Sequence, residues 1–215
     1  MGLAIEVGCL AKYVGDGDDA RADQFREDMT HINAKLEERD LSPHSEPQSF
    51  DNELAMRASL TSFPYSWLHY LRRFAAHAIR DPKWVPYPIQ PGEDPAADPV
   101  LHQMYRQMRS HLLCHSDREG YYIPVDFGPL ILDPSHEMRG GVVGSSQQLR
   151  QELISICNPL EIELNDQGEL DDQAASRLST QRPNETPFAI ERLVWLALYE
   201  AATVSIEEDT AIVFC

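Results

Sequence analysis

The sequence predicts a helix-rich α+β fold: a single domain over residues 1–215, with about six helices around a small mixed or antiparallel sheet. Helical and strand-like periodicities follow one another in irregular order, so the repeated βα alternation of a doubly wound sheet is missing. The chain has 215 residues, 42% of them hydrophobic and 25% charged, which is typical of an ordered globular domain. Alternating apolar residues near both ends predict terminal strands that can pair and close the domain.

Local spacing predicts each element in turn. Residues 3–9 alternate between apolar and polar, which is typical of a strand. Phe25, Met29 and Ile32 recur at helical spacing and predict a helix over 19–39. Pro64 divides the next helical region, 51–80, so that its second part begins near residue 65. The same patterns predict further helices over 101–115, 146–157, 171–179 and 188–202, and strands over 120–133, 160–164 and 210–214.

Residues 81–99 form a proline-rich stretch between two predicted helices. Six prolines in this stretch exclude a continuous helix and favour an extended path. The stretch also contains the apolar residues Trp84, Val85, Tyr87 and Ile89, which a flexible linker would lack. We therefore expect an ordered strap within the domain.

The composition excludes several classes of protein. The chain has 35 acidic and 18 basic residues and a formal net charge of -17, which argues against broad binding to nucleic-acid phosphates or anionic membranes. No apolar run approaches the ~20 residues of a membrane span, and the N-terminal residues do not resemble a signal peptide. The four cysteines are far apart in sequence, so no cysteine motif indicates a metal or redox site. We expect a cytoplasmic protein and predict no cofactor.

The negative charge is concentrated in the C-terminal third. Residues 140–215 contain 13 acidic and 4 basic residues, a balance of -9. Six of these carboxylates follow one another with no intervening basic residue: Glu161, Glu163, Asp166, Glu169, Asp171 and Asp172. In contrast, no carboxylate occurs between Glu53 and Asp81, an interval that contains four arginines.

This charge pattern favours a protein-binding or inhibitory module that uses the six carboxylates to bind a basic protein. Opposite charge would speed the encounter of such partners. Bacterial immunity proteins and antitoxins are of this physical type, although no motif identifies either. We expect no membrane partner and no broad nucleic-acid binding, and the sequence indicates no oligomeric state.

The alternative is a small-molecule enzyme or ligand-binding protein with a site between the helices over 65–80 and 101–115. Arg73, Arg106, Arg109 and His111 are the candidate anion ligands, because arginine binds carboxylate and phosphate groups through paired hydrogen bonds. A solvent-exposed basic face, or one paired with the acidic third, would give the same pattern.

The same region contains the candidate metal ligands and catalytic groups. His111 and His115 are four residues apart, so a helix would place them on one side, where Asp126 could add an oxygen ligand. His115 with Asp117 could instead act as a general acid and base. A histidine near a helix C-terminus also has a purely structural role. No complete catalytic motif is present, which favours a non-enzymatic role and leaves catalysis as the alternative.

Overall fold

The computed structural model describes residues 2–135, 137–183 and 185–215. Eight α-helices lie within these ranges: α1 (Cys9–Asp16), α2 (Asp19–Glu37), α3 (Tyr65–Arg80), α4 (Pro99–Tyr105), α5 (His111–Cys114), α6 (Ser146–Ser155), α7 (Asp172–Ser179) and α8 (Ala189–Glu207). Six strands accompany them: β1 (Gly2–Val7), β2 (Ser62–Pro64), β3 (Gly120–Ile123), β4 (Ile131–Leu132), β5 (Val142–Ser145) and β6 (Ile212–Phe214). The predicted helix-rich α+β class is confirmed, with slightly more helices than expected.

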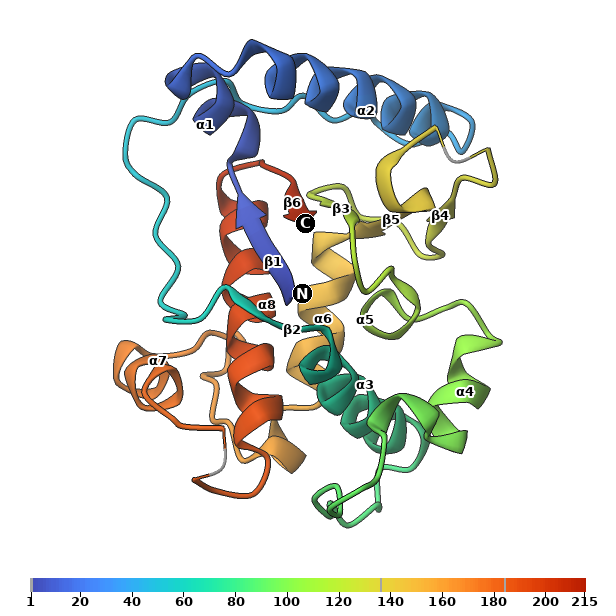
Figure 1. Cartoon of the computed structure of the whole chain (residues 1–215), viewed down its shortest axis with the longest axis vertical. Coiled ribbons are helices and arrows are strands. Elements are labelled where there is room, and N and C mark those ends of the chain that lie inside the picture. Colours follow the sequence, from blue (N-terminus) through green and yellow to red (C-terminus); the bar gives the residue numbers. More distant parts are fainter. Residues whose placement is uncertain (1, 136, 184) are drawn as a thin grey trace.

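The strands form one sheet in the order β2-β1-β6-β3-β5-β4. The sheet is mixed, because β3 and β5 run parallel and the other neighbouring pairs run antiparallel. β1 pairs with β6, with Glu6 opposite Val213, which confirms the predicted pairing of the terminal strands. Figure 1 shows the two marked ends of the chain close to this pair of strands.

The sheet separates two hydrophobic cores, because neighbouring side chains of a strand point to opposite faces. Tyr122 and Phe214 belong to the larger core, which also contains the buried sides of α3, α6 and α8. Tyr121 and Val213 belong to the smaller core, which α1 and α2 cover. In Figure 1, α2 lies across the top of the molecule, while α8 and α6 pass through its body.

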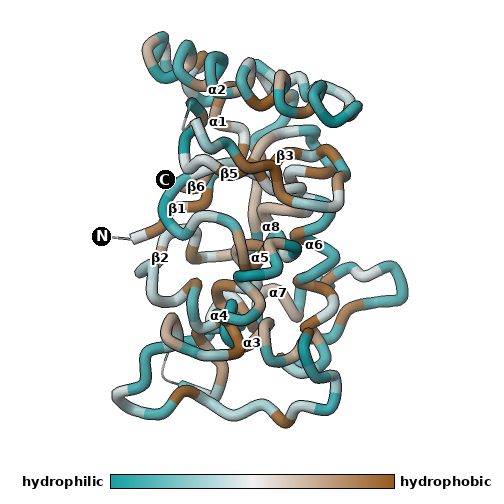
Figure 2. Tube along the Cα trace, turned by 90° about the vertical axis from the view of Figure 1, so that its right-hand side faces the viewer, coloured by the Kyte–Doolittle hydropathy of each residue, from teal (hydrophilic) through white to brown (hydrophobic). Residues whose placement is uncertain are grey.

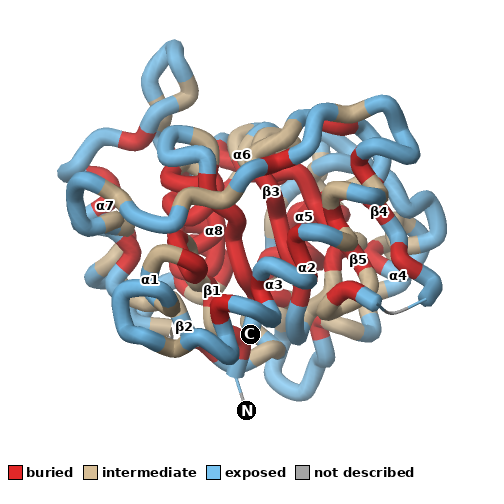
Figure 3. Tube along the Cα trace, turned by 90° about the horizontal axis from the view of Figure 1, so that it is seen from above, coloured by how far each residue is buried: buried red, intermediate tan, exposed pale blue. Residues whose placement is uncertain are grey.

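The two longest helices have opposite surroundings. Every residue of α8 from Glu191 to Ala202 is buried, and Figure 3 shows this helix within the buried interior. α2 has the predicted apolar stripe on its inner side and polar residues on its outer side, visible as the teal parts of the helix in Figure 2. No helix in the described part of the chain is both long and apolar enough to cross a membrane.

Three predicted elements are wrong. Residues 51–61, the first part of the helical region expected over 51–80, form a loop, which the buried Glu200 carboxylate holds by accepting the Arg57 N–H at 2.9 Å. The single helix expected over 101–115 is divided into α4 and α5, because Met108 adopts a φ of 48° and Ser110 caps a new helix by accepting the Leu113 N–H at 3.0 Å. The strand expected over 160–164 is absent from the described structure. A short 3-10 helix ends there at Leu160, and the left-handed Glu161 that follows, with a φ of 59°, redirects the chain.

The strap over residues 81–99 packs on α3. The Trp84 ring stacks on His77 with a centroid distance of 5.0 Å and meets the Phe74 ring edge-on at 5.1 Å. Arg73, one of the candidate anion ligands, is only 4% exposed. Its guanidinium lies 4.5 Å from the Tyr87 ring centre, and its Nε lies 3.4 Å from an Asp98 carboxylate oxygen. The strap therefore covers a basic side chain that the sequence assigned to an anion site or to a solvent-exposed basic face.

Candidate protein-binding surface

The acidic segment, residues 161–172, lies on the surface. All six of its predicted partner-binding carboxylates are exposed: Glu161, Glu163, Asp166, Glu169, Asp171 and Asp172. Turns give the segment its shape, because the Asn165 side-chain oxygen accepts the backbone N–H groups of Gln167 and Glu169 at 2.9 Å each. Asp171 caps α7 by accepting the Ala174 N–H at 2.7 Å. The segment therefore presents its carboxylates from a defined backbone.

Two of these carboxylates contact arginines and still face solvent. Glu161 accepts from Arg192 at 2.6 Å, and Asp172 accepts from Arg57 at 2.9 Å. The side chains of Glu161 and Asp172 are 80% and 95% exposed. In each pair the arginine is the more buried partner, so the carboxylate remains accessible to a binding partner.

A second group of carboxylates meets at the end of α8. Asp51 and Glu53, from the loop after α2, line a cavity of about 260 Å³ together with Glu207 and Glu208. Within the described structure, no basic side chain lines this cavity, and we call these four residues the acidic groove. The sequence shows Glu207 and Glu208 as a charge run but assigns Asp51 and Glu53 to a helical region. Because about 150 residues separate the two pairs, no local sequence pattern predicts that they lie together.

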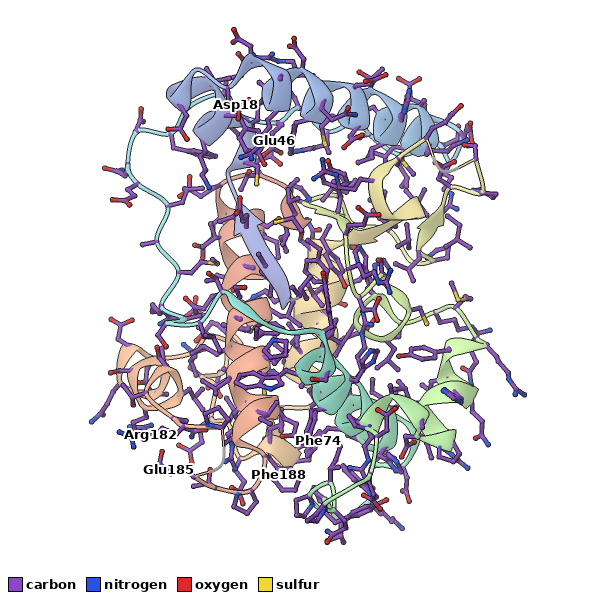
Figure 4. The ribbon with its side chains drawn as sticks, in the orientation of Figure 1. Asp18, Glu46, Phe74, Arg182, Glu185 and Phe188 are labelled. Atoms are coloured by element: carbon purple, nitrogen blue, oxygen red, sulfur yellow. The ribbon has the colours of Figure 1, made fainter. Side chains whose placement is uncertain are left out.

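The loop that carries Asp51 and Glu53 is fixed to the end of α8. Glu46, whose side chain is 2% exposed, accepts the Ala211 N–H at 2.8 Å and the Thr210 hydroxyl. His44 Nε2 lies 2.7 Å from the same carboxylate, which lies beneath the α1–α2 layer in Figure 4. Gly8 has a φ of 66°, and a Cβ there would lie 2.7 Å from the Leu54 side chain, so glycine permits the loop to approach.

The outer side of α2 carries a third set of carboxylates. Asp18, labelled in Figure 4, caps the helix by accepting the Arg21 N–H at 3.1 Å. Asp19, Asp23 and Glu27 then follow at intervals of four residues, about 6 Å apart along the helix axis, and all three are exposed. Arg26 pairs with Asp23 at 2.8 Å, so this row is partly neutralised.

The predicted anion ligands have different surroundings. Arg73 is buried against the strap, as described above, whereas Arg106 and Arg109 are exposed between α4 and α5. His111 is buried, with Nε2 2.7 Å from the Gly128 carbonyl oxygen and Nδ1 accepting the Ser145 N–H at 2.8 Å. Both ring nitrogens of His111 are therefore occupied by backbone groups, and the structure does not bring the four side chains to one site.

The predicted metal and acid–base residues are also apart. His115 is buried, with Nε2 3.0 Å from the Tyr121 carbonyl oxygen, and burial lowers its pKa to about 4. Asp117 lies 3.2 Å from His69, and Asp126 accepts from the Gln148 amide at 2.7 Å. In the described ranges, no group of three or more His, Cys, Asp or Glu residues is arranged to hold a metal ion.

Several charged side chains point inward. Arg72 is 2% exposed and donates to the carbonyl oxygens of Leu112 and His115 at 2.9 and 2.7 Å. Arg192 is 8% exposed and donates to the Leu160 carbonyl oxygen at 2.8 Å. Together with Arg73, three arginines are buried. Burial leaves the net surface charge close to the sequence total, because the arginines are offset by buried carboxylates: Asp28, Asp133, Glu191 and Glu200.

A family model described as "Putative DNA-mimic protein" matches residues 1–214. No curated protein and no solved structure matches the chain. The family description is compatible with the predicted acidic protein-binding module, but the partner prediction is wrong because it set nucleic acid aside. A DNA mimic is a protein that binds DNA-binding proteins in place of DNA. The negative charge that repels DNA phosphates is also the charge that can imitate them. With all but the last residue matched, the chain belongs to the family described as "Putative DNA-mimic protein".

Proposed function

We propose that this chain binds a DNA-binding protein in place of DNA and so inhibits the binding of DNA by that partner. The family match over residues 1–214 carries the proposal. The exposed carboxylates supply its physical basis, because a cationic DNA-binding surface is complementary to any regular array of negative charge.

The distribution of carboxylates along α8 supports this proposal. Near the start of the helix, Glu161 pairs with Arg192. Further along, Arg57 bridges Asp172 and Glu200. At the end of the helix, Glu207 and Glu208 belong to the acidic groove. From residue 192 to residue 208, a helix rises by about 24 Å, the length of roughly seven base-pair steps of B-DNA. The acidic groove and the acidic segment are therefore the surfaces we assign to partner binding.

Displacement from DNA tests the proposal directly. Proteins from an extract of the source cells are bound to immobilised duplex DNA and eluted with this chain at constant ionic strength. We expect a subset of DNA-bound proteins to be released. For each released protein, competition against a labelled duplex is then measured by fluorescence anisotropy, with an affinity that falls steeply between about 50 and 200 mM salt.

A matched pair of variants separates the proposed surface from overall charge. Neutralising the groove with Asp51→Asn, Glu53→Gln, Glu207→Gln and Glu208→Gln changes the net charge from -17 to -13. Neutralising four exposed carboxylates away from the groove, with Glu37→Gln, Glu38→Gln, Asp40→Asn and Glu137→Gln, gives the same charge. We expect the first variant to compete much more weakly than the second. Release of the same proteins by an unrelated acidic protein of equal charge would contradict the proposal.

A further inference from the structure

Arg57 is the basic residue closest in sequence to the acidic groove, and it is held by a buried carboxylate. Its Nη2 donates to Glu200 Oε1 at 2.7 Å, and its Nε donates to Glu200 Oε2 at 3.0 Å. The backbone N–H of Arg57 also donates to Glu200 Oε2 at 2.9 Å. The Glu200 side chain is 5% exposed on the buried helix α8, so the loop after the groove is fixed to the centre of the molecule.

The remaining nitrogen of Arg57 contacts the acidic segment. Nη1 donates to the Leu170 carbonyl oxygen at 2.8 Å and to Asp172 Oδ1 at 2.9 Å. Two residues further on, the Ser59 N–H donates to the Ser179 hydroxyl oxygen at 2.9 Å, which joins the same loop to the end of α7. One guanidinium therefore connects the groove loop, α8 and the acidic segment.

The carboxylate partners of Arg57 favour its charged form. The hydrogen bonds that Glu200 accepts from Arg57 are the largest cause that raises the pKa of this arginine, and they outweigh the opposite effect of burial. A cation without partners would weaken a DNA-mimicking surface, whereas Arg57, whose side chain is 35% exposed, uses four of its five N–H donors within the chain. In Figure 1 the loop before β2 passes down the side of the molecule from α2 toward α7.

We propose that Arg57 is a positioning residue that sets the spacing between the acidic groove and the acidic segment, and so the match to a DNA-binding partner. This inference rests on the proposed function. It predicts a change in partner affinity opposite in sign to the change expected from net charge alone. Removing a positive charge from an acidic mimic should strengthen its binding to a cationic partner, whereas losing the spacing should weaken that binding.

The variant Arg57→Gln tests this difference against Arg177→Gln. Both variants change the net charge from -17 to -18. Arg177 is exposed on α7, and its side chain makes no hydrogen bond or ion pair with the described residues. In the anisotropy competition against a released partner, we expect Arg57→Gln to raise the dissociation constant about tenfold, which corresponds to ~1.4 kcal/mol. We expect Arg177→Gln to leave the constant unchanged or lower it.

Hydrogen exchange tests the positioning role without a partner. In Arg57→Gln, amides of residues 51–57 and 169–174 should exchange faster, while those of α2 keep the wild-type rates. Arg57→Lys keeps the positive charge but loses the paired hydrogen bonds to Glu200, so we expect an intermediate effect in both measurements. If Arg57→Gln does not fold, the result for Arg57→Lys tests the inference. Equal or tighter partner binding by the folded Arg57 variant, or unchanged exchange in both segments, would overturn the inference. If the wild-type chain displaces no protein from DNA, the proposed function fails, while the exchange result still reports on the spacing.

Discussion

Helices α2 and α3 are both amphipathic by sequence, yet the structure uses their charged residues in opposite ways. The outer carboxylates of α2, such as Asp19 and Glu27, face solvent. Two of the three arginines of α3, Arg72 and Arg73, are buried, and they donate to carbonyl oxygens or approach Asp98. The outer carboxylates of α2 therefore contribute to the surface potential, whereas Arg72 and Arg73 contribute to internal structure. Helical periodicity thus does not by itself decide whether a charged side chain faces solvent.

The largest expected effect is the loss of a buried arginine of α3. Arg72→Ala removes the donor to three backbone carbonyl oxygens and leaves a cavity, so we expect the free energy of unfolding to fall by about 3–5 kcal/mol. Chemical denaturation measures this change. The control is Arg26→Ala on α2, where the arginine is half-exposed, and a change of no more than ~0.5 kcal/mol is expected. Similar losses for the two variants would remove the contrast between the helices.

A smaller effect concerns His115, whose carbonyl oxygen accepts from Arg72. Burial lowers the pKa of His115 from 6.5 to about 4. Between these values the unfolded chain binds a proton at this residue and the folded chain does not, so stability falls as the pH falls through this window. We expect His115 to contribute up to ~3 kcal/mol to this loss.

Unfolding measured from pH 7 to pH 4 checks the effect of His115. His115→Gln should lose stability at neutral pH but show a weaker dependence on pH than the wild type. The exposed His102 serves as the control, because His102→Gln should keep the wild-type dependence. An unchanged pH dependence in His115→Gln would show that burial does not hold this ring neutral.

The smallest effect is expected on the outer side of α2. Neutralising its row of carboxylates with Asp19→Asn, Asp23→Asn and Glu27→Gln should change the free energy of unfolding by less than ~1 kcal/mol in total, because each side chain faces water. Thermal and chemical unfolding give this value. A loss comparable with that of Arg72→Ala would mean that the carboxylates of α2 are structural as well, and the contrast drawn above would be wrong.

The sequence predicted the candidate site only in part. The six carboxylates of the acidic segment could be found because they are consecutive charges without basic neighbours, and such runs are typical of solvent-exposed segments. The acidic groove could not, because Asp51 and Glu53 meet Glu207 and Glu208 only after folding. The net charge argues only against binding of DNA itself, so it could not reveal that an acidic protein can imitate DNA.

By itself the sequence determined the α+β class, the amphipathic helix α2 and the pairing of β1 with β6, because side-chain periodicity is a local property that burial of apolar residues enforces. Only the tertiary structure decided which charged groups are internal. Arg57 meets Glu200 across 143 residues, and Arg72 reaches backbone carbonyl oxygens that begin 40 residues away. A buried charge is stable only where partners from distant segments satisfy its hydrogen bonds, and no local pattern specifies those partners.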